Sequence, residues 1–341
     1  MCNLQRMFTV SSESAGILLG LLLVTSCDAE PTPLGPCDGL PEGRIDFAKD
    51  EAVHPNAPME WWYWTGHLQD VEGRWFGFEQ TFFHLQTPEL LASMVHFAIT
   101  DIEDQSFHYV VHYGSDLADQ PKRGFDFLIR EQSAHGVDGH DVLHGQVDNY
   151  VLDVDLRGMK KPVLQHEDGY TDYSFGGNTY YYSRERMAAT ATLQIGGDTV
   201  ELSGEGWFDH QWGEMGSVVN RGWDWFAVQL DDNVEIMVFI ARNEGADVMV
   251  GGSITDSDCH TREIPAEEVE VESHGTWQSP HTGCLYPQNW TLLIDGMEIH
   301  LDAVLDDQEV VSFAPTYWEG AVTVSGDATG RGYVELNGYC N

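Results

Sequence analysis

Short runs of alternating apolar residues, broken by Gly and Asp roughly every ten positions, run through most of this chain. Three of them read as hairpins: Leu68–Phe78 with a turn at Glu72-Gly73, Thr192–Leu202, and Trp290–Leu301 with Asp295-Gly296 at its turn. A period of two places successive side chains on opposite faces of a strand. The pattern therefore predicts an all-β protein, with one short helix expected over 88–94.

A diverged internal repeat indicates how the strands are grouped. Trp62-x-Trp64 precedes Asp70 with the same spacing that separates Trp223-x-Trp225 from Asp231, and the tails 200–204 and 334–338 also match. Two β domains of similar plan would explain both matches. We expect two antiparallel β-barrels side by side, over 46–214 and 215–341. A closed barrel of about eight strands can hold one small apolar ligand.

The N-terminus predicts export. The apolar run 17–24 is too short to span a bilayer, and the small residues that follow it lead directly to Cys27. This arrangement is typical of a bacterial lipoprotein signal over 1–26, with Cys27 as the acylated residue. Ordinary secretion with cleavage nearby is the alternative. Residues 27–45 read as a flexible tether, because 28–42 are rich in Pro, Gly and acids.

Four cysteines remain after export: Cys37, Cys259, Cys284 and Cys340. An even number in an oxidising compartment predicts two disulfides with three possible connectivities. We favour Cys259 with Cys284, which closes a local loop, and Cys37 with Cys340. No metal site is expected, since the cysteines lack zinc spacing and His140 and His144 stand in a Gly-rich context that favours a loop.

The charge excludes two classes of partner. With 16 basic and 56 acidic residues, the formal net charge is -40. Such a surface repels nucleic acid and anionic lipid head groups, so we expect contact with a membrane only through the lipid anchor.

Three segments combine acids with aromatic rings: 60–64, 204–213 and 222–226. They hold seven of the 11 tryptophans. This clustering suggests an aromatic-lined cavity near the junction of the two halves. A carboxyl group held among apolar rings has a raised pKa and can keep a proton near neutrality.

The candidate catalytic residues are Asp209, His210 and Asp224. We assign proton donation to Asp209, with His210 as its orienting partner or as the base for water. The expected ligand-binding residues are Glu60, Trp61, Trp62, Trp64, Glu79, Trp207, Trp212, Trp223 and Trp225. Structural alternatives exist for each: a turn carboxylate for Asp209, a buried structural histidine for His210, and acceptors of indole N–H groups for Glu60 and Asp224.

Motifs over most of residues 54–339 resemble one known family. They are Glu60-Trp61-Trp62-Tyr63, the run 73–83, Tyr180–Ser183, Trp207–Gly213, Gly222–Trp225, Tyr317–Gly320 and Gly330–Tyr333. In this order they resemble the AttH/CrtC family, which has two lipocalin-like domains and includes carotenoid 1,2-hydratases. The resemblance implies addition of water to an isoprenoid double bond, or cyclisation of a polyene, without a cofactor.

Two functions follow as hypotheses. The first is a cofactor-independent hydro-lyase that hydrates or cyclises an apolar, unsaturated isoprenoid- or lipid-like ligand with acid assistance. The second is an exported lipocalin-type carrier that binds a hydrophobic small molecule without chemistry. Whether a bound ligand is released altered distinguishes them.

Overall fold

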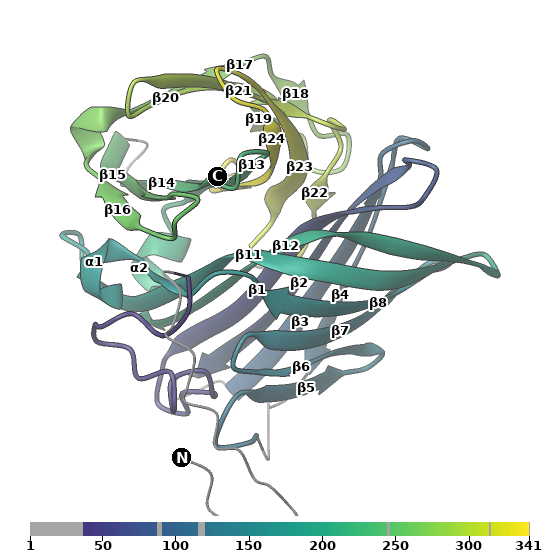
Figure 1. Ribbon diagram of the computed structural model, residues 1–341, viewed down its shortest axis with the longest axis horizontal. Helices are drawn as coiled ribbons and strands as arrows, with labels where there is room; N and C mark the ends of the chain where they lie inside the picture. The colour runs from purple at the N-terminus through teal and green to yellow at the C-terminus, as the bar shows by residue number, and fades with distance from the viewer. Residues whose placement is uncertain (1–36, 87–90, 115–119, 244–245, 314, 341) are drawn as a thin grey trace, which may run out of the picture. The chain divides into compact units, whose positions relative to one another are not determined.

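The computed structural model describes residues 37–340, apart from 87–90, 115–119, 244–245 and 314. The predicted signal peptide, Cys27 and the first part of the tether lie outside these residues. Among the described residues, no helix has the length and hydropathy of a membrane span. The fold is nearly all β, with two nearly closed, barrel-like antiparallel sheets, so the predicted fold class is confirmed (Figure 1).

The first sheet contains twelve strands in the order β4-β3-β2-β1-β12-β11-β8-β7-β6-β5, with β9 and β10 also paired to β11. Its strands are β1 (Met59–Gln69), β2 (Trp75–Gln86), β3 (Leu91–Asp101), β4 (Ser106–Gly114), β5 (Phe125–Ile129), β6 (Gln132–Val137), β7 (His140–Val147), β8 (Tyr150–Gly158), β9 (Val163–Leu164), β10 (Tyr170–Asp172), β11 (Asn178–Ile195) and β12 (Asp198–Glu214). A short helix, α1 (His166–Gly169), precedes β10.

The second sheet contains ten strands in the order β16-β15-β14-β13-β24-β23-β21-β20-β17, with β22 paired to β23. Its strands are β13 (Trp223–Leu230), β14 (Glu235–Asn243), β15 (Ala246–Thr255), β16 (Thr261–Ile264), β17 (Val269–His274), β20 (Asn289–Ile294), β21 (Met297–Ala303), β22 (Glu309–Val310), β23 (Tyr317–Gly326) and β24 (Gly330–Asn337). A separate pair is formed by β18 (Trp277–Gln278) and β19 (Leu285–Tyr286), α2 (Gly216–Val219) connects the two large sheets, and η1 (Ala266–Glu268) precedes β17.

Both large sheets close in the same way. In each, the first strand lies between the second and the last, as β1 lies between β2 and β12 and β13 lies between β14 and β24. The three predicted hairpins form with the expected pairings. At the Asp295-Gly296 turn both residues have positive φ, 51° and 77°, as a type I′ turn requires. The short helix expected over 88–94 is wrong for its described part, since β3 begins at Leu91.

Each barrel interior is filled by its own side chains. The core of the first sheet includes Trp62, Trp64, Phe82 and Phe208, and that of the second includes Phe226 and Trp290. A third cluster joins residues of both sheets, including Tyr63 and Trp207 from the first and Trp225 and Tyr333 from the second. The outer faces of the two sheets therefore pack against each other through a mixed aromatic layer.

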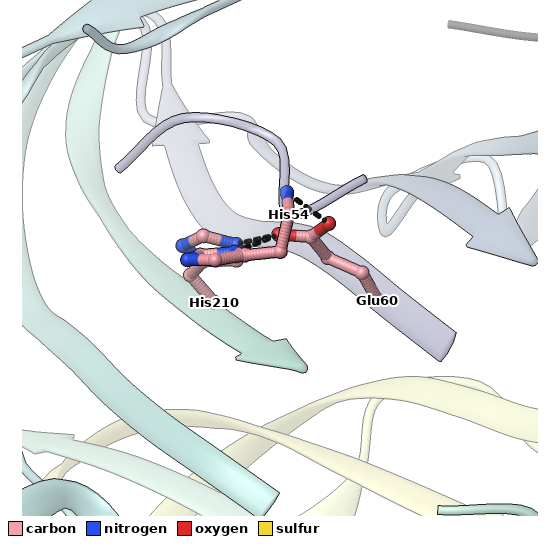
Figure 2. Close-up of side chains that lie close together, drawn as sticks. All are labelled: His54, Glu60 and His210. Carbon is pink, nitrogen blue, oxygen red and sulfur yellow. Dashed lines mark hydrogen bonds and ion pairs between the residues drawn. The ribbon is translucent and has the colours of Figure 1, made fainter. Parts of the chain in front are cut away.

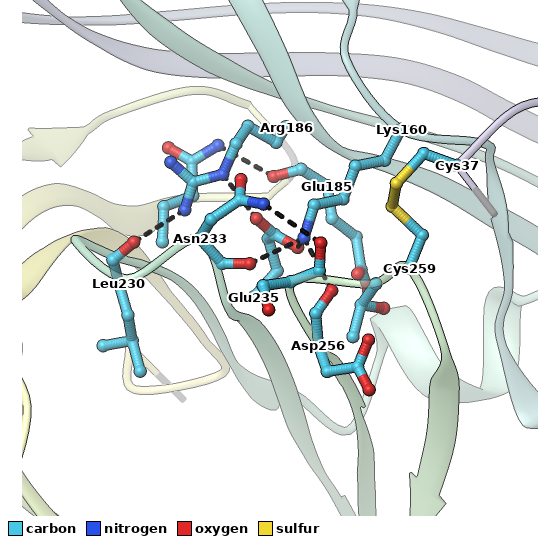
Figure 3. Close-up of polar contacts among 12 residues, drawn as sticks. Cys37, Lys160, Glu185, Arg186, Leu230, Asn233, Glu235, Asp256 and Cys259 are labelled. Carbon is cyan, nitrogen blue, oxygen red and sulfur yellow. Dashed lines mark hydrogen bonds and ion pairs between the residues drawn. A yellow bond between two sulfur atoms is a disulfide. The ribbon is translucent and has the colours of Figure 1, made fainter. Parts of the chain in front are cut away.

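A buried ionic network also joins the two sheets (Figure 3). Lys160 Nζ donates to Glu235 Oε2 at 2.6 Å, to the Asn233 carbonyl at 2.7 Å and to the Asp256 carbonyl at 2.9 Å. The Arg186 guanidinium also binds Glu235. Because Glu235 is the carboxylate that both cations share, its removal leaves the buried Lys160 ammonium without an ion-pair partner among the described residues.

The four cysteines form two disulfides, but the favoured pairing is wrong. Cys37 bonds to Cys259, and Cys284 bonds to Cys340. Local spacing was misleading because the turn that carries Cys259 lies beside the N-terminal segment. Lys160 donates a hydrogen bond to the carbonyl of Asp256, three residues before Cys259, close to this disulfide (Figure 3).

Replacing both Cys37 and Cys259 with Ser should lower the free energy of unfolding by about 2–5 kcal/mol, because this bond closes a loop with a sequence separation of 222 residues. Removing Cys284–Cys340, with a separation of 56 residues, should cost about 1 kcal/mol less in the chain-entropy account. Urea unfolding of the two double variants measures both values. Equal denaturation midpoints for wild type and the Cys37/Cys259 variant would contradict the expectation.

Candidate functional site

Strand alternation separates the predicted site residues into two groups. Register pairs Trp62 with His210 and Tyr63 with Asp209 across β1 and β12. The even-numbered residues face the interior of the first barrel, where Trp62 and Trp212 belong to its core. The odd-numbered residues face outward, toward the second sheet. Asp209 and His210 are thus neighbours in sequence on opposite faces of one strand.

A cavity of about 310 Å³ lies between the two sheets. Strands β1, β2, β11 and β12 provide one side, β13, β14 and β24 the other, and the segment around α2 a third wall. Its apolar lining includes Met59, Trp61, Phe83, Leu85, Trp223, Trp225 and Phe239, and its polar lining includes Tyr63, His166, Tyr181, Asp209, Gln211 and Glu335. The volume falls at the lower end of the ~300–1,000 Å³ typical of small-molecule sites.

Asp209 is held in one orientation by aromatic donors. The Tyr181 hydroxyl donates to Oδ2 at 2.5 Å and the Trp207 indole donates to Oδ1 at 2.7 Å. Trp225 in turn donates to the Tyr181 hydroxyl at 3.1 Å. Burial raises the pKa of Asp209 to about 6, against the lowering effect of these hydrogen bonds. The group is therefore mostly ionised at pH 7 and is partly protonated in mild acid.

Glu335 is a second carboxyl group on the same cavity. It lies on β24 opposite Trp225 of β13, and the Trp223 indole donates a hydrogen bond to it. Burial, together with the negative charges of Glu79 and Asp209, raises its pKa to about 8. At neutral pH Glu335 is mostly protonated while Asp209 is mostly ionised.

Two more glutamates lie behind Glu335 in the layer between the sheets. Glu319 is the register partner of Glu335 on β23 and accepts a hydrogen bond from the Tyr63 hydroxyl at 2.6 Å. Glu79 accepts one from Thr81. Burial raises the pKa of Glu79 to about 8 and that of Glu319 well above its usual range. Each keeps one buried oxygen without a hydrogen-bond partner among the described residues.

The structure places His210 away from Asp209. His210 Nε2 lies 2.8 Å from Glu60 Oε1, and His54 Nδ1 lies 2.7 Å from the same oxygen (Figure 2). The His210 ring stacks on the Trp62 indole, with ring centroids 4.7 Å apart. The predicted role of His210 as orienting partner of Asp209 is therefore wrong, because the alternation of β12 turns the two side chains apart.

The other predicted residues divide in the same way. Trp61, Trp223 and Trp225 line the cavity, and Trp207 lies behind Asp209. The expectation that Trp62 and Trp212 line it is wrong, since both belong to the first barrel core, as does Trp64, whose indole donates to Asp141 at 3.0 Å. Asp224 points away from Trp223 and Trp225, where it binds Arg242 and accepts from the Tyr339 hydroxyl.

The expected loop at His140 and His144 is also wrong. Both residues lie on strand β7, where they bind different carboxylates, Asp155 at 2.8 Å and Asp153 at 2.7 Å.

The internal repeat matched Trp62-x-Trp64 with Trp223-x-Trp225, but the two pairs of tryptophans face opposite sides of their sheets. Trp62 and Trp64 point into the first barrel, whereas Trp223 and Trp225 point out of the second toward the cavity. The residue that faces Trp223 across the cavity layer is Trp61, with ring centroids 6.4 Å apart and an interplanar angle of 14°. An offset of one residue in the repeat accounts for this change of face.

The sequence interpretation missed Tyr63, Tyr181, Glu319 and Glu335. Three of them stand in motifs that it did quote, Glu60–Tyr63, Tyr180–Ser183 and Tyr317–Gly320, and Glu335 lies in the repeated tail 334–338. Counting every second residue outward from Asp209 and Trp225 along paired strands would have found the face that they share.

Comparisons with known proteins support the fold and decide the family. The family model described as AttH-like matches residues 39–339. The chain belongs to the AttH-like family. No curated protein matches the sequence.

Several solved structures are similar to this AttH-like protein. A candidate AttH protein from Nitrosomonas europaea is 27% identical with a TM-score of 0.81, over 89% of this chain and 99% of that one. Kievitone hydratase from Nectria haematococca is 19% identical with a TM-score of 0.73, over 89% and 98%. CghA in complex with Sch210972 is 11% identical with a TM-score of 0.54, over 90% and 96%. The last two likenesses concern the fold.

Adjacent tryptophans on opposite faces of β1 provide a matched test of the cavity. Trp61→Ala should weaken binding of an apolar ligand roughly 10-fold, about 1.4 kcal/mol, because Trp61 is a cavity wall. Trp62→Ala should leave affinity nearly unchanged but lower the free energy of unfolding by about 3–5 kcal/mol, because Trp62 is a fully buried core residue. Probe titration and urea unfolding of both variants measure this; loss of binding in Trp62→Ala alone would place the ligand inside the barrel.

Proposed function

We propose that this AttH-like protein binds an apolar, unsaturated, isoprenoid- or lipid-like ligand in the cavity between its sheets and catalyses acid-assisted hydration or cyclisation of a double bond. The observation that carries the proposal is the pair of carboxyl groups, Asp209 and Glu335, on the wall of one aromatic cavity. The similarity to a protein named as a hydratase, kievitone hydratase, agrees with this reaction class.

The two carboxyl groups suit a division into acid and base. Glu335, protonated at neutral pH, donates its proton to one carbon of the double bond and leaves a carbocation on the other. In hydration, water adds to the cation and its proton passes to Asp209, which the Tyr181 and Trp207 hydrogen bonds keep ionised. This revises the initial assignment of proton donation to Asp209. Transfer of the proton back to Glu335 restores the enzyme.

The walls of the cavity stabilise the intermediate. Trp61, Trp223 and Trp225 line the cavity, and the faces of aromatic rings attract a cation through their quadrupole. The side chains of Gln211 and His166 are polar groups on the same wall that can position water. A ligand that lacks room for water beside the cation would cyclise instead, through attack by its own second double bond.

The division of roles predicts a bell-shaped dependence of turnover on pH. Asp209 must be ionised, so turnover should fall below pH about 6, and Glu335 must be protonated, so it should fall above pH about 8. The measurement is kcat/KM of the converted ligand across this range. A single limb in which turnover falls as pH rises through about 6 would instead identify Asp209 as the proton donor.

A carrier without chemistry is the second candidate. The observation in its favour is that both Asp209 oxygens already accept hydrogen bonds from the protein, as a purely structural carboxylate would. In a carrier these groups would fix the polar end of a hydrophobic ligand.

We also propose that the protein works outside the cytoplasm as a lipoprotein anchored at Cys27. The two disulfides support an oxidising compartment. Labelling of the expressed full chain with a radioactive fatty acid tests the anchor, with Cys27→Ser as control. Equal labelling of both chains would overturn it.

Native mass spectrometry with organic extraction tests the function. The form that starts after Cys27 is purified from a host supplied with lipid and isoprenoid extract. A co-purified apolar molecule supports the cavity, and a hydrated or cyclised form of a supplied precursor supports catalysis. A protein that carries no ligand and binds no apolar probe would show that the aromatic residues serve only as packing.

A further inference from the structure

Three side chains of types that ligate metals converge on the inner face of the first sheet, and none of them lines the cavity described above. His54 precedes β1, Glu60 lies on β1 and His210 lies on β12 (Figure 2). Register pairs Glu60 with Trp212 and Trp62 with His210, so Glu60 and His210 are diagonal neighbours on one face. One donor atom from each of the three residues lies within 4.8 Å of the other two.

Aromatic packing fixes the direction of both imidazole rings. The His54 ring stacks on Trp212 at 4.1 Å with an interplanar angle of 8°, and His210 stacks on Trp62 and meets the edge of Tyr182. His54 Nδ1 and His210 Nε2 are thereby aimed at the same oxygen, Glu60 Oε1, at 2.7 and 2.8 Å. A ligand set ordered in advance loses little conformational freedom on binding.

We propose that His54, Glu60 and His210 form a binding site for a divalent transition-metal ion, for which Zn²⁺ is the appropriate probe. Two imidazole nitrogens and one carboxylate oxygen are a donor set that zinc takes, with the fourth position left for water. Tetrahedral zinc with bonds of about 2.0–2.1 Å holds its ligands roughly 3.3 Å apart. The distances from His54 Nδ1 and His210 Nε2 to Glu60 Oε1, 2.7 and 2.8 Å, would therefore open by about half an ångström.

The surroundings suit such an ion. Asp50 Oδ1 lies 3.5 Å from His54 Nε2, which is where a metal-bound histidine usually meets a carboxylate or carbonyl partner. The Glu60 and His210 side chains are fully buried, whereas that of His54 is 22% exposed. The His54 side thus provides the entry path and the water position.

Equilibrium dialysis with Zn²⁺ in excess Ca²⁺ tests the site. Calcium prefers oxygen ligands and occupies the acidic surface, so the zinc that remains reports on nitrogen donors. The purified protein should retain one zinc ion per chain and unfold at a higher temperature with zinc than without. His54→Gln should weaken binding by more than the roughly 10–100-fold that loss of an outer partner costs.

Two further variants keep the outcome decisive. His140→Gln removes an exposed histidine that pairs with Asp155, and it should bind zinc as wild type does. His210→Gln should lose binding as His54→Gln does, and folding of each variant is checked by circular dichroism. Zinc retention equal in wild type and His54→Gln, or no zinc retained by wild type, would overturn the proposal without bearing on the function of the cavity.

Discussion

Asp209→Asn should lower turnover of the bound ligand by roughly 10²–10⁴-fold, the usual contribution of a positioned acid or base. The substitution keeps the shape of the side chain. The Asn oxygen can still accept from Trp207, and the amide NH2 group then faces the Tyr181 hydroxyl, which can rotate to accept from it, so ligand affinity should change little. The loss should therefore appear in kcat. The measurement is conversion of the extracted ligand under single-turnover conditions.

Asp141 offers a matched control for this variant. It is also a buried aspartate, burial raises its pKa to about 6, and it accepts a hydrogen bond from a tryptophan, Trp64. It differs in position, because Trp64 belongs to the core of the first barrel. Asp141→Asn should keep turnover near the wild-type value. Equal losses in the two variants would indicate general destabilisation and would contradict a catalytic role for Asp209.

Glu79→Gln and Glu319→Gln should stabilise the protein above pH 7 and flatten the dependence of its stability on pH. Both glutamates have raised pKa values because of burial, whereas in the unfolded chain they ionise near pH 4.5. The folded state therefore binds more protons than the unfolded chain above pH 4.5. For Glu79, whose folded-state pKa is about 8, stability falls as pH rises from about 4.5 to 8. Each extra bound proton contributes about 1.4 kcal/mol per pH unit.

Urea unfolding between pH 5 and 9 measures this effect as the difference between variant and wild type. Neighbouring histidines also titrate: burial lowers the pKa of His96 to about 3, which reduces wild-type stability in acid. Glu235→Gln is the contrasting control. Its carboxylate pairs with Lys160 and Arg186, so its loss should destabilise the protein by about 3–5 kcal/mol. If the free energy of unfolding varied with pH in the same way for wild type and Glu79→Gln, the raised pKa of Glu79 in the folded protein would be contradicted.

Strand periodicity made the fold predictable from the sequence. Hairpins such as Trp290–Leu301 carry both the alternation and the turn residues that specify them, and the family motifs extend over both barrels. The disulfide partners were not predictable in this way. Cys259 meets Cys37 only because two segments 222 residues apart come together in the folded chain.

The candidate site was predicted only in part. Asp209, Trp61, Trp223 and Trp225 were identified from the density of aromatic and acidic residues. That criterion does not resolve the face of a strand, so it grouped Asp209 with His210. Alternation alone would have separated the two, but which face is the barrel interior depends on how the sheet curls and on what packs against it. Glu335 was missed because an isolated glutamate on a strand carries no local signal.

A crystal structure of Asp209→Asn with its extracted ligand tests the central claim most directly. We expect ligand density between Trp61, Trp223 and Trp225, with an unsaturated carbon within about 3–3.5 Å of a carboxyl oxygen of Glu335. Density inside either barrel, with the space between the sheets empty, would contradict it.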